Sequence, residues 1–357
     1  MQENRRNFLK LGATSAAVGV LGQAAAAEVE TEAPQIGAIA PLAAKLGLRL
    51  VTFAPGQQDQ PRVGVVFDDG QVIDVGAEAK RQKVKLAFDP DSMLSLIDSG
   101  DQGVVQVHAL AERAALLRIM RPTVNHVRLL SPIPRPRANI YAVGWNYLDH
   151  FEEGKAARVD RVVTEYPANP VFFTKGVNTM NGPFDTIPFD ASNSTQVDWE
   201  AELAVVIGRG GRNIKEEQAM NHVFGYAVYN DTTARDVQQK RHGGQWFKGK
   251  SLDGYGPMGP WIVTAAGLHL DDARIISRVN GVEKQNASYK QMYFKIPRII
   301  AELSRGMTLD AGDIITTGTP SGVGFSRKPP EFMKPGDVME TEVTGIGIIR
   351  NVIKAEG

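Results

Sequence analysis

The sequence predicts an α+β protein that is mainly β, in which a small α+β domain precedes a larger β-rich domain. Two features support this arrangement. Runs of β-branched and aromatic residues are short and separated by glycine and proline, which is typical of closed or rolled β architectures. Helical spacing of apolar residues is confined to a few stretches. The length of 357 residues fits about two domains.

The first residues have the pattern of an export signal. Arg5 and Arg6 precede Phe-Leu-Lys, an apolar run over residues 11–22 and a cluster of alanines. This order is typical of a twin-arginine signal peptide, and the apolar run is too short to span a bilayer stably. We therefore predict a signal peptide over residues 1–27, a linker over residues 28–46, and an exported, periplasmic protein that is free of the membrane after cleavage. An amphipathic N-terminal helix is the alternative.

The predicted small domain covers residues 47–134. It combines strand patterns around an Asp-Asp-Gly turn signal with two helical patterns, and a group of prolines marks its end. The strands are expected over residues 48–53, 63–67 and 71–75, and the helices over residues 92–97 and 104–120.

The predicted larger domain covers residues 135–357 and contains most of the short strands. Two helices are expected in it, over residues 214–223 and 296–303. The strands are expected over residues 140–143, 171–173, 203–207, 261–263, 314–317 and 341–343.

The composition excludes several classes of protein. Hydrophobic residues make up 43% and charged residues 22%, as in a folded domain and unlike a disordered chain. Forty basic residues balance forty acidic ones, which argues against binding to nucleic acid. The absence of cysteine excludes disulfides, thiolate nucleophiles and cysteine-ligated metals.

Two glutamates stand at the start of a run that reads as a buried strand. Glu200 and Glu202 are two residues apart, so on a strand their side chains point to the same face. Buried together they would repel each other, and a hard cation such as Mg²⁺, Mn²⁺ or Ca²⁺ would remove that cost. Glutamates that simply face water are the alternative. Asp231 follows another apolar run and is either a third ligand or a turn or capping residue.

Further candidates could move protons or bind anions. His150 and Glu153 share one face of a helical turn, where the carboxylate would orient the imidazole as a base; incidental surface charges are the alternative. Residues 244–251 match the phosphate-loop string, but the flanking strand and helix are missing, so we interpret the match as accidental. Lys250 in this loop could still face an anionic ligand. Residues 316–324 follow a strand and could offer amides and hydroxyls to a carboxylate, or form a plain turn.

These segments, in this order, resemble the fumarylacetoacetate hydrolase superfamily. The resemblance extends from Arg135 to the C-terminus and rests on five ordered motifs. The motifs occupy residues 143–153, 198–208, 230–238, 246–251 and 316–324.

The resemblance implies a mixed β-roll catalytic domain, a small N-terminal domain and a homodimer. It implies one Mg²⁺ or Mn²⁺ ion held by Glu200, Glu202 and Asp231. It further implies a His150–Glu153 pair on a lid. The remaining implied site residues are Lys250, Gln238 and Arg235 as catalytic groups and Thr319, Gly318 and Lys175 as substrate-binding groups.

The function expected from this resemblance is metal-dependent hydrolysis of a carbon–carbon bond in a small 2-oxo or 1,3-dioxo acid, such as an acylpyruvate. The metal would chelate the oxo acid and hold the leaving enolate, while His150 and Glu153 would activate water. Decarboxylase, lyase or isomerase chemistry on a 2-oxo or 2-hydroxymuconate-type acid is the alternative for the same site. A periplasmic metal-dependent dicarboxylate-binding protein is the non-enzymatic alternative.

Overall fold

The computed structural model describes residues 47–56, 60–117, 119–155 and 165–356. The predicted signal peptide over residues 1–27 and the linker over residues 28–46 lie outside the described residues. Within the described part of the chain, no helix has the length and apolar character needed to cross a membrane.

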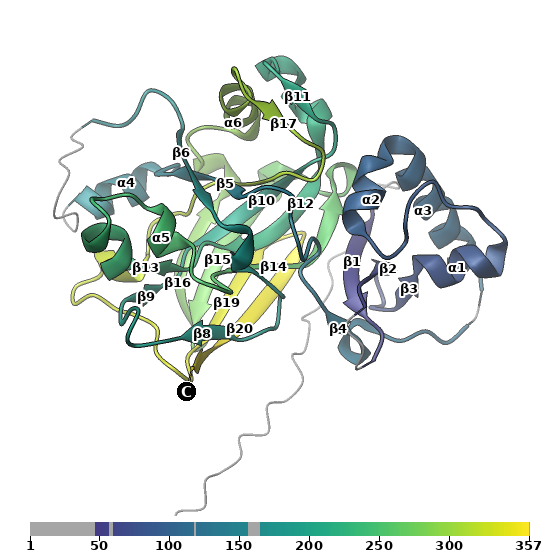
Figure 1. Ribbon diagram of the computed structural model, residues 1–357, viewed down its shortest axis with the longest axis horizontal. Helices are drawn as coiled ribbons and strands as arrows, with labels where there is room; N and C mark the ends of the chain where they lie inside the picture. Colours follow the sequence, from purple (N-terminus) through teal and green to yellow (C-terminus); the bar gives the residue numbers. More distant parts are fainter. Residues whose placement is uncertain (1–46, 57–59, 118, 156–164, 357) are drawn as a thin grey trace, which may run out of the picture. The chain divides into compact units, whose positions relative to one another are not determined.

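The larger of the two main sheets has eleven strands. Figure 1 shows how the elements are arranged. Short strands β4 (Arg128–Leu129) and β7 (Met180–Asn181) pair beside its main path. Along that path the strands are β3 (Val72–Asp74), β2 (Arg62–Val66), β1 (Arg49–Ala54), β14 (Gly256–Thr264), β12 (Val223–Asn230), β10 (Ala201–Ile207), β18 (Ile314–Thr316), β5 (Ile140–Gly144) and β6 (Val171–Lys175).

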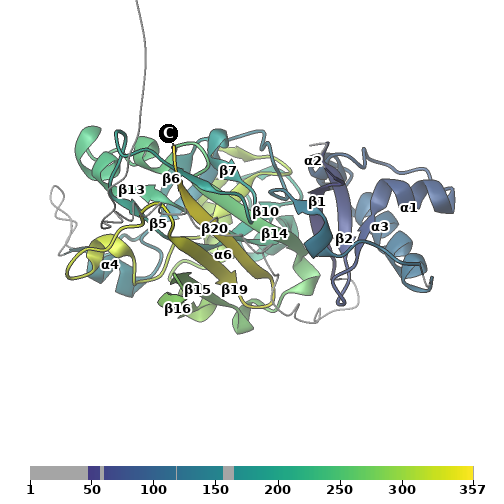
Figure 2. The same ribbon diagram turned by 90° about the horizontal axis from the view of Figure 1, so that it is seen from below.

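A second sheet of five strands packs against it (Figure 2). Alternate side chains of β10 face the two opposite sides of the large sheet. Leu203 and Val205 join a core with Ile275 and Ile349 of the second sheet, whereas Val206 joins the core on the opposite face. A strand buried on both faces is a continuous apolar run, which is why β10 is the clearest strand in the sequence. The order of the second sheet is β16 (Val282–Ser288), β15 (Arg274–Val279), β19 (Val338–Val343), β20 (Gly347–Ala355) and β8 (Ile187–Phe189).

The large sheet is strongly curled. Lys175 ends β6, which lies four strands from β12 in the sheet order, yet its ammonium lies 2.7 Å from the carboxylate of Asp231 just beyond β12. Four strand spacings span about 19 Å in a flat sheet, which is far beyond the reach of a lysine. The mixed β fold with a rolled sheet that the sequence predicted is therefore confirmed.

The N-terminal region is a small α+β unit whose sheet continues the large one. Helices α1 (Val75–Gln82), α2 (Met93–Asp98) and α3 (Gly100–Ala115) share one core with β1 and β2 (Figure 1). β1 pairs antiparallel with β14, so strands from both predicted domains belong to one sheet. Helix α1 was not predicted, because only part of its short length is apolar.

One of the two α-helices predicted in the larger domain has another conformation in the structure. Residues 216–222 form a 3₁₀ helix instead of the expected α-helix over residues 214–223, and Ala219 is its only buried residue. With one apolar contact, this segment lacks the stripe that stabilises an α-helix. The other, α6 (Ile296–Leu303), is present as predicted.

Several further elements are short. They are β9 (Val197–Asp198), β11 (Gly211–Arg212), β13 (Thr233–Ala234), β17 (Thr308–Leu309), α4 (Leu148–Lys155), α5 (Phe247–Lys250) and a π-helix over Val237–Arg241.

We expect Ile315→Ala to lower the free energy of unfolding by about 2–5 kcal/mol. Ile315 is fully buried in β18, which joins β10 to β5. Urea denaturation measures the change. The control is Val282→Ala at a residue that is 58% exposed on β16, which should cost less than about 1 kcal/mol. Equal effects of the two substitutions would contradict the position of β18 inside the core.

Candidate active site

Strand pairing brings three carboxylates together inside the protein. β10 and β12 run antiparallel with Ala201 opposite Asn230, so the start of one strand lies beside the end of the other. The amide of Asp231 donates to the carbonyl of Glu200 over 2.9 Å. Ligand oxygens of Glu200, Glu202 and Asp231 all lie within 4.8 Å of one another, and all three side chains are buried.

Cationic side chains surround two of these carboxylates. The ammonium of Lys250 lies 2.7 Å from Glu200 Oε2 and 2.7 Å from Asp231 Oδ2. The second oxygen of Glu200 faces the Arg235 guanidinium at 2.6 Å, and the second oxygen of Asp231 faces Lys175 at 2.7 Å. Burial alone would raise the pKa of Glu200, but Lys250 and Arg235 outweigh it and lower that pKa.

The negative charge of Glu202 has fewer partners than the charges of Glu200 and Asp231. One of its oxygens accepts a hydrogen bond from the Gly318 amide at 2.8 Å. Burial, together with the charges of Asp231 and Glu200, raises the pKa of Glu202 well above its ordinary value. The cluster therefore lacks positive charge at Glu202. Three buried carboxylates at this spacing are a donor set that suits a hard divalent cation such as Mg²⁺ or Mn²⁺, and the residues fit the metal implied by the sequence.

A histidine–carboxylate pair lies on the other side of the pocket. Helix α4 places His150 Nδ1 2.9 Å from Glu153 Oε1. Glu153 in turn accepts hydrogen bonds from the Gly322 amide at 2.9 Å and the Ser326 hydroxyl at 2.8 Å. Burial opposes ionisation of Glu153, but His150 and these donors together lower its pKa. Because Nδ1 faces the carboxylate, the Nε2 edge of His150 is the edge that can serve the pocket.

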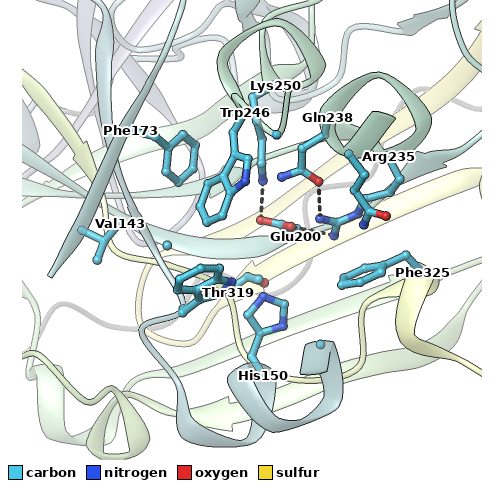
Figure 3. Close-up of a pocket in the computed structure, with 15 residues that line it drawn as sticks. Val143, His150, Phe173, Glu200, Arg235, Gln238, Trp246, Lys250, Thr319 and Phe325 are labelled. Carbon is cyan, nitrogen blue, oxygen red and sulfur yellow. Dashed lines mark hydrogen bonds and ion pairs between the residues drawn. The ribbon is translucent and has the colours of Figure 1, made fainter. Parts of the chain in front are cut away.

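The pocket lies between these two groups. Figure 3 shows His150 on one side of Glu200, and Lys250 and Gln238 on the opposite side. Gln238 accepts a hydrogen bond from Arg235 at 3.1 Å, which fixes the amide with its nitrogen free to face a ligand. A ligand in this pocket would contact a histidine on one face, and an ammonium and an amide on the other.

The sequence-predicted residues fall into two groups. Some line the pocket and the others lie behind it. The pocket is lined by His150, Glu200, Arg235, Gln238, Lys250 and Thr319, and the second group consists of Glu153, Glu202, Asp231, Lys175 and Gly318.

Three residues predicted to bind substrate have defined partners here. Lys175 is fully buried and pairs with Asp231 and the carbonyl of Thr232. Thr319 donates to the carbonyl of Ala201 at 3.0 Å and lines the pocket. Gly318 has φ +92° and presents its amide to Glu202. Contact with substrate stays a prediction for all three.

Sequence reasoning missed Asp198, which organises both sides of the site. Its carboxylate accepts from Arg235 Nε at 2.7 Å and from the amides of Gly324 at 2.7 Å and Phe325 at 3.1 Å. It therefore fixes a guanidinium and the loop that holds Glu153. The signal was available, because Asp198 precedes Glu200 by the same two-residue step that separates the glutamates.

Comparison with known proteins identifies the family. The model of the fumarylacetoacetate hydrolase C-terminal region matches residues 139–354, which is more than half of the chain. The chain belongs to the fumarylacetoacetate hydrolase family. It is therefore an enzyme of that family with a carboxylate triad suited to a divalent metal.

Two relatives of this chain in the family are named oxaloacetate tautomerases. The oxaloacetate tautomerase YisK of Bacillus subtilis is 41% identical over 308 residues, covering 84% of this chain and 99% of that protein. The mitochondrial oxaloacetate tautomerase FAHD2A of Homo sapiens is 36% identical over 310 residues, covering 86% of this chain and 91% of that protein.

Solved structures of the family agree with the fold. The fumarylacetoacetate hydrolase of psychrophilic Exiguobacterium antarcticum is 37% identical with a TM-score of 0.69, covering 87% of this chain and all of that one. The maleylpyruvate hydrolase of Sphingobium sp. SYK-6, solved with manganese(II) and pyruvate, is 28% identical with a TM-score of 0.65, over 87% of this chain and all of that one.

We expect Glu202→Gln to lower the affinity for Mn²⁺ by about 100-fold, since it removes one charged ligand and leaves the shape of the side chain. Calorimetric titration of metal-free protein measures the affinity. Glu217→Gln, at an exposed glutamate, should leave the affinity unchanged.

Thermal unfolding separates this effect from misfolding. Without metal, Glu202→Gln should unfold no earlier than the parent, because the amide removes one of three mutually repelling carboxylates. Unchanged Mn²⁺ affinity would contradict the assignment of Glu202 as a ligand.

Proposed function

We propose that this protein is a metal-dependent tautomerase that interconverts the enol and keto forms of a small 2-oxo dicarboxylic acid of the oxaloacetate type. The observation that carries the proposal is the position of His150, an imidazole oriented by Glu153 and facing a pocket whose opposite wall is cationic. The names of the relatives with 41% and 36% identity over more than four fifths of the chain support the same chemistry.

The reaction requires only the transfer of protons. In the enol-to-keto direction the hydroxyl proton on the C2 oxygen is lost and a proton is added at C3, so atoms and electrons balance. His150 carries a proton to or from C3, and Glu153 holds the ring in place because its carboxylate lies 2.9 Å from Nδ1. Lys250 and Gln238 face the developing negative charge on the C2 oxygen.

A divalent cation held by Glu200, Glu202 and Asp231 would supply Lewis-acid polarisation of the 2-oxo group. Lys250 and Arg235 line the pocket, and together with the metal they would face an anionic acid.

The relatives favour the isomerase alternative over the hydrolase that the sequence put first. Hydrolysis of a carbon–carbon bond in an acylpyruvate is the second candidate, and one observation favours it. A base placed to move a proton at carbon is also able to deprotonate water, and His150 with Glu153 is such a base. A pure binding protein would need no such pair.

The test follows decay of the ultraviolet absorbance of enol-oxaloacetate. Protein stripped with chelator and reloaded with Mg²⁺ or Mn²⁺ should accelerate the decay above the spontaneous rate without releasing pyruvate. We expect His150→Asn to lower kcat by about 100- to 10,000-fold with a much smaller change in KM, because the substitution removes the proton carrier and keeps the pocket filled.

The opposite outcome is equally clear. Release of pyruvate from an acylpyruvate, with no acceleration of enol decay, would reject the tautomerase and support the hydrolase. Export by the twin-arginine route and a homodimeric assembly stay predictions of the sequence.

A further inference from the structure

One side of the pocket is built from aromatic rings. Trp145, Phe173 and Trp246 line it, and each is only partly buried by the protein. The ring centres of Trp145 and Trp246 lie 5.1 Å apart and those of Phe173 and Trp246 lie 5.2 Å apart, both edge to face. In Figure 3, Phe173 and Trp246 lie together on one side of Glu200, away from Arg235 and Phe325.

The backbone is shaped to bring these rings together. Trp145 adopts φ +56°, in the left-handed region that bulky residues rarely occupy. Gly144 lies directly beneath the Trp246 ring, and a Cβ added at Gly144 would be 2.5 Å from Trp246 Cζ3. Packing against Trp246 therefore requires glycine at position 144. The left-handed conformation of Trp145 is of a kind that is found at ligand sites.

The cations of the pocket are held in ion pairs. Lys250 is paired with Glu200 and Asp231, and Arg235 with Asp198 and Glu200. The ammonium of Lys250 lies 5.3 Å from the centre of the Phe173 ring, so one cation adjoins the aromatic side, where Val143 and Gly144 are uncharged pocket residues. A flat unsaturated group placed there would gain contact with the rings, and the distal carboxylate of an oxaloacetate-type acid would face Lys250.

We propose that Trp145, Phe173 and Trp246 form a distal subsite that accepts a planar, unsaturated substituent on C3 of a 2-oxo acid. The enzyme then also tautomerises the enols of arylpyruvates. This inference rests on the proposed tautomerase function and extends its substrates. The carboxylate and C2 oxygen remain at the polar end beside Lys250, and C3 remains within the reach of His150.

The experiment compares two substrates on one set of variants. The metal-loaded full chain is assayed with enol-oxaloacetate and with the enol of phenylpyruvate. We expect wild-type turnover of both, and we expect Trp246→Ala to lower kcat/KM for phenylpyruvate at least tenfold more than for oxaloacetate. Gly144→Ala, which pushes the ring of Trp246 without removing it, should change the same ratio in the same direction.

A neighbouring ring provides the matched control. Phe247 follows Trp246 in the chain, is 47% exposed and does not line the pocket, so Phe247→Ala should leave the ratio within about twofold. Trp246→Phe should recover much of the phenylpyruvate activity, which a merely structural role would not require.

The outcomes distinguish failure of the aromatic subsite from failure of the proposed tautomerase function. Turnover of oxaloacetate without turnover of phenylpyruvate overturns the subsite and leaves the tautomerase intact. Turnover of both with an unchanged ratio in Trp246→Ala overturns the assignment to these rings. Turnover of neither enol overturns the tautomerase together with the inference that rests on it.

Discussion

Three carboxylates buried within 4.8 Å of one another impose the constraint on which the rest of the site depends. Like charges in a low-dielectric interior are tolerated only when cations neutralise them. The fold supplies Lys250, Arg235 and Lys175 from three separate segments of the chain for this purpose. Each contact explains a part of the architecture. Lys175 reaches Asp231 only because the sheet is curled, and Lys250 does so because the short helix α5 follows a glycine-rich loop. A divalent cation would complete the compensation at Glu202.

One loop connects the carboxylate cluster to the His150–Glu153 pair. The loop after β18 donates the Gly318 amide to Glu202 and, four residues later, the Gly322 amide to Glu153. Gly318 is required at its position, because φ is +92° and a Cβ would lie 2.7 Å from the Cβ of Asn146. Asp198 holds the far end of this loop. Metal ligand, loop and His150 therefore form one connected unit, and displacement of the loop would disturb both halves of the chemistry together.

Much of this could be predicted from the sequence, and the reasons for the gaps are physical. Carboxylates in an apolar run are costly, so Glu200, Glu202 and Asp231 were conspicuous. The three-residue spacing of His150 and Glu153 was likewise visible because it is local. The ion pair between Lys175 and Asp231 joins residues 56 positions apart across a curled sheet, and no local pattern encodes it. The aromatic side of the pocket was missed for the same reason, since Trp145 and Trp246 meet only in the fold. The 3₁₀ helix over residues 216–222 shows the reverse error, because a spacing that reads as an α-helix supplies one buried contact there, Ala219.

The identity of the reaction lay beyond sequence reasoning, because one set of ligands and one base serve hydrolysis and tautomerisation alike. What all these reactions share is the occupied metal site, and its location is the most direct test. Crystals of the protein soaked in Mn²⁺ would be measured near the manganese absorption edge. We expect one anomalous peak within about 2–2.5 Å of an oxygen of Glu200, Glu202 and Asp231. A peak elsewhere, or none while Lys250 still bridges Glu200 and Asp231, would contradict the metal-centred site.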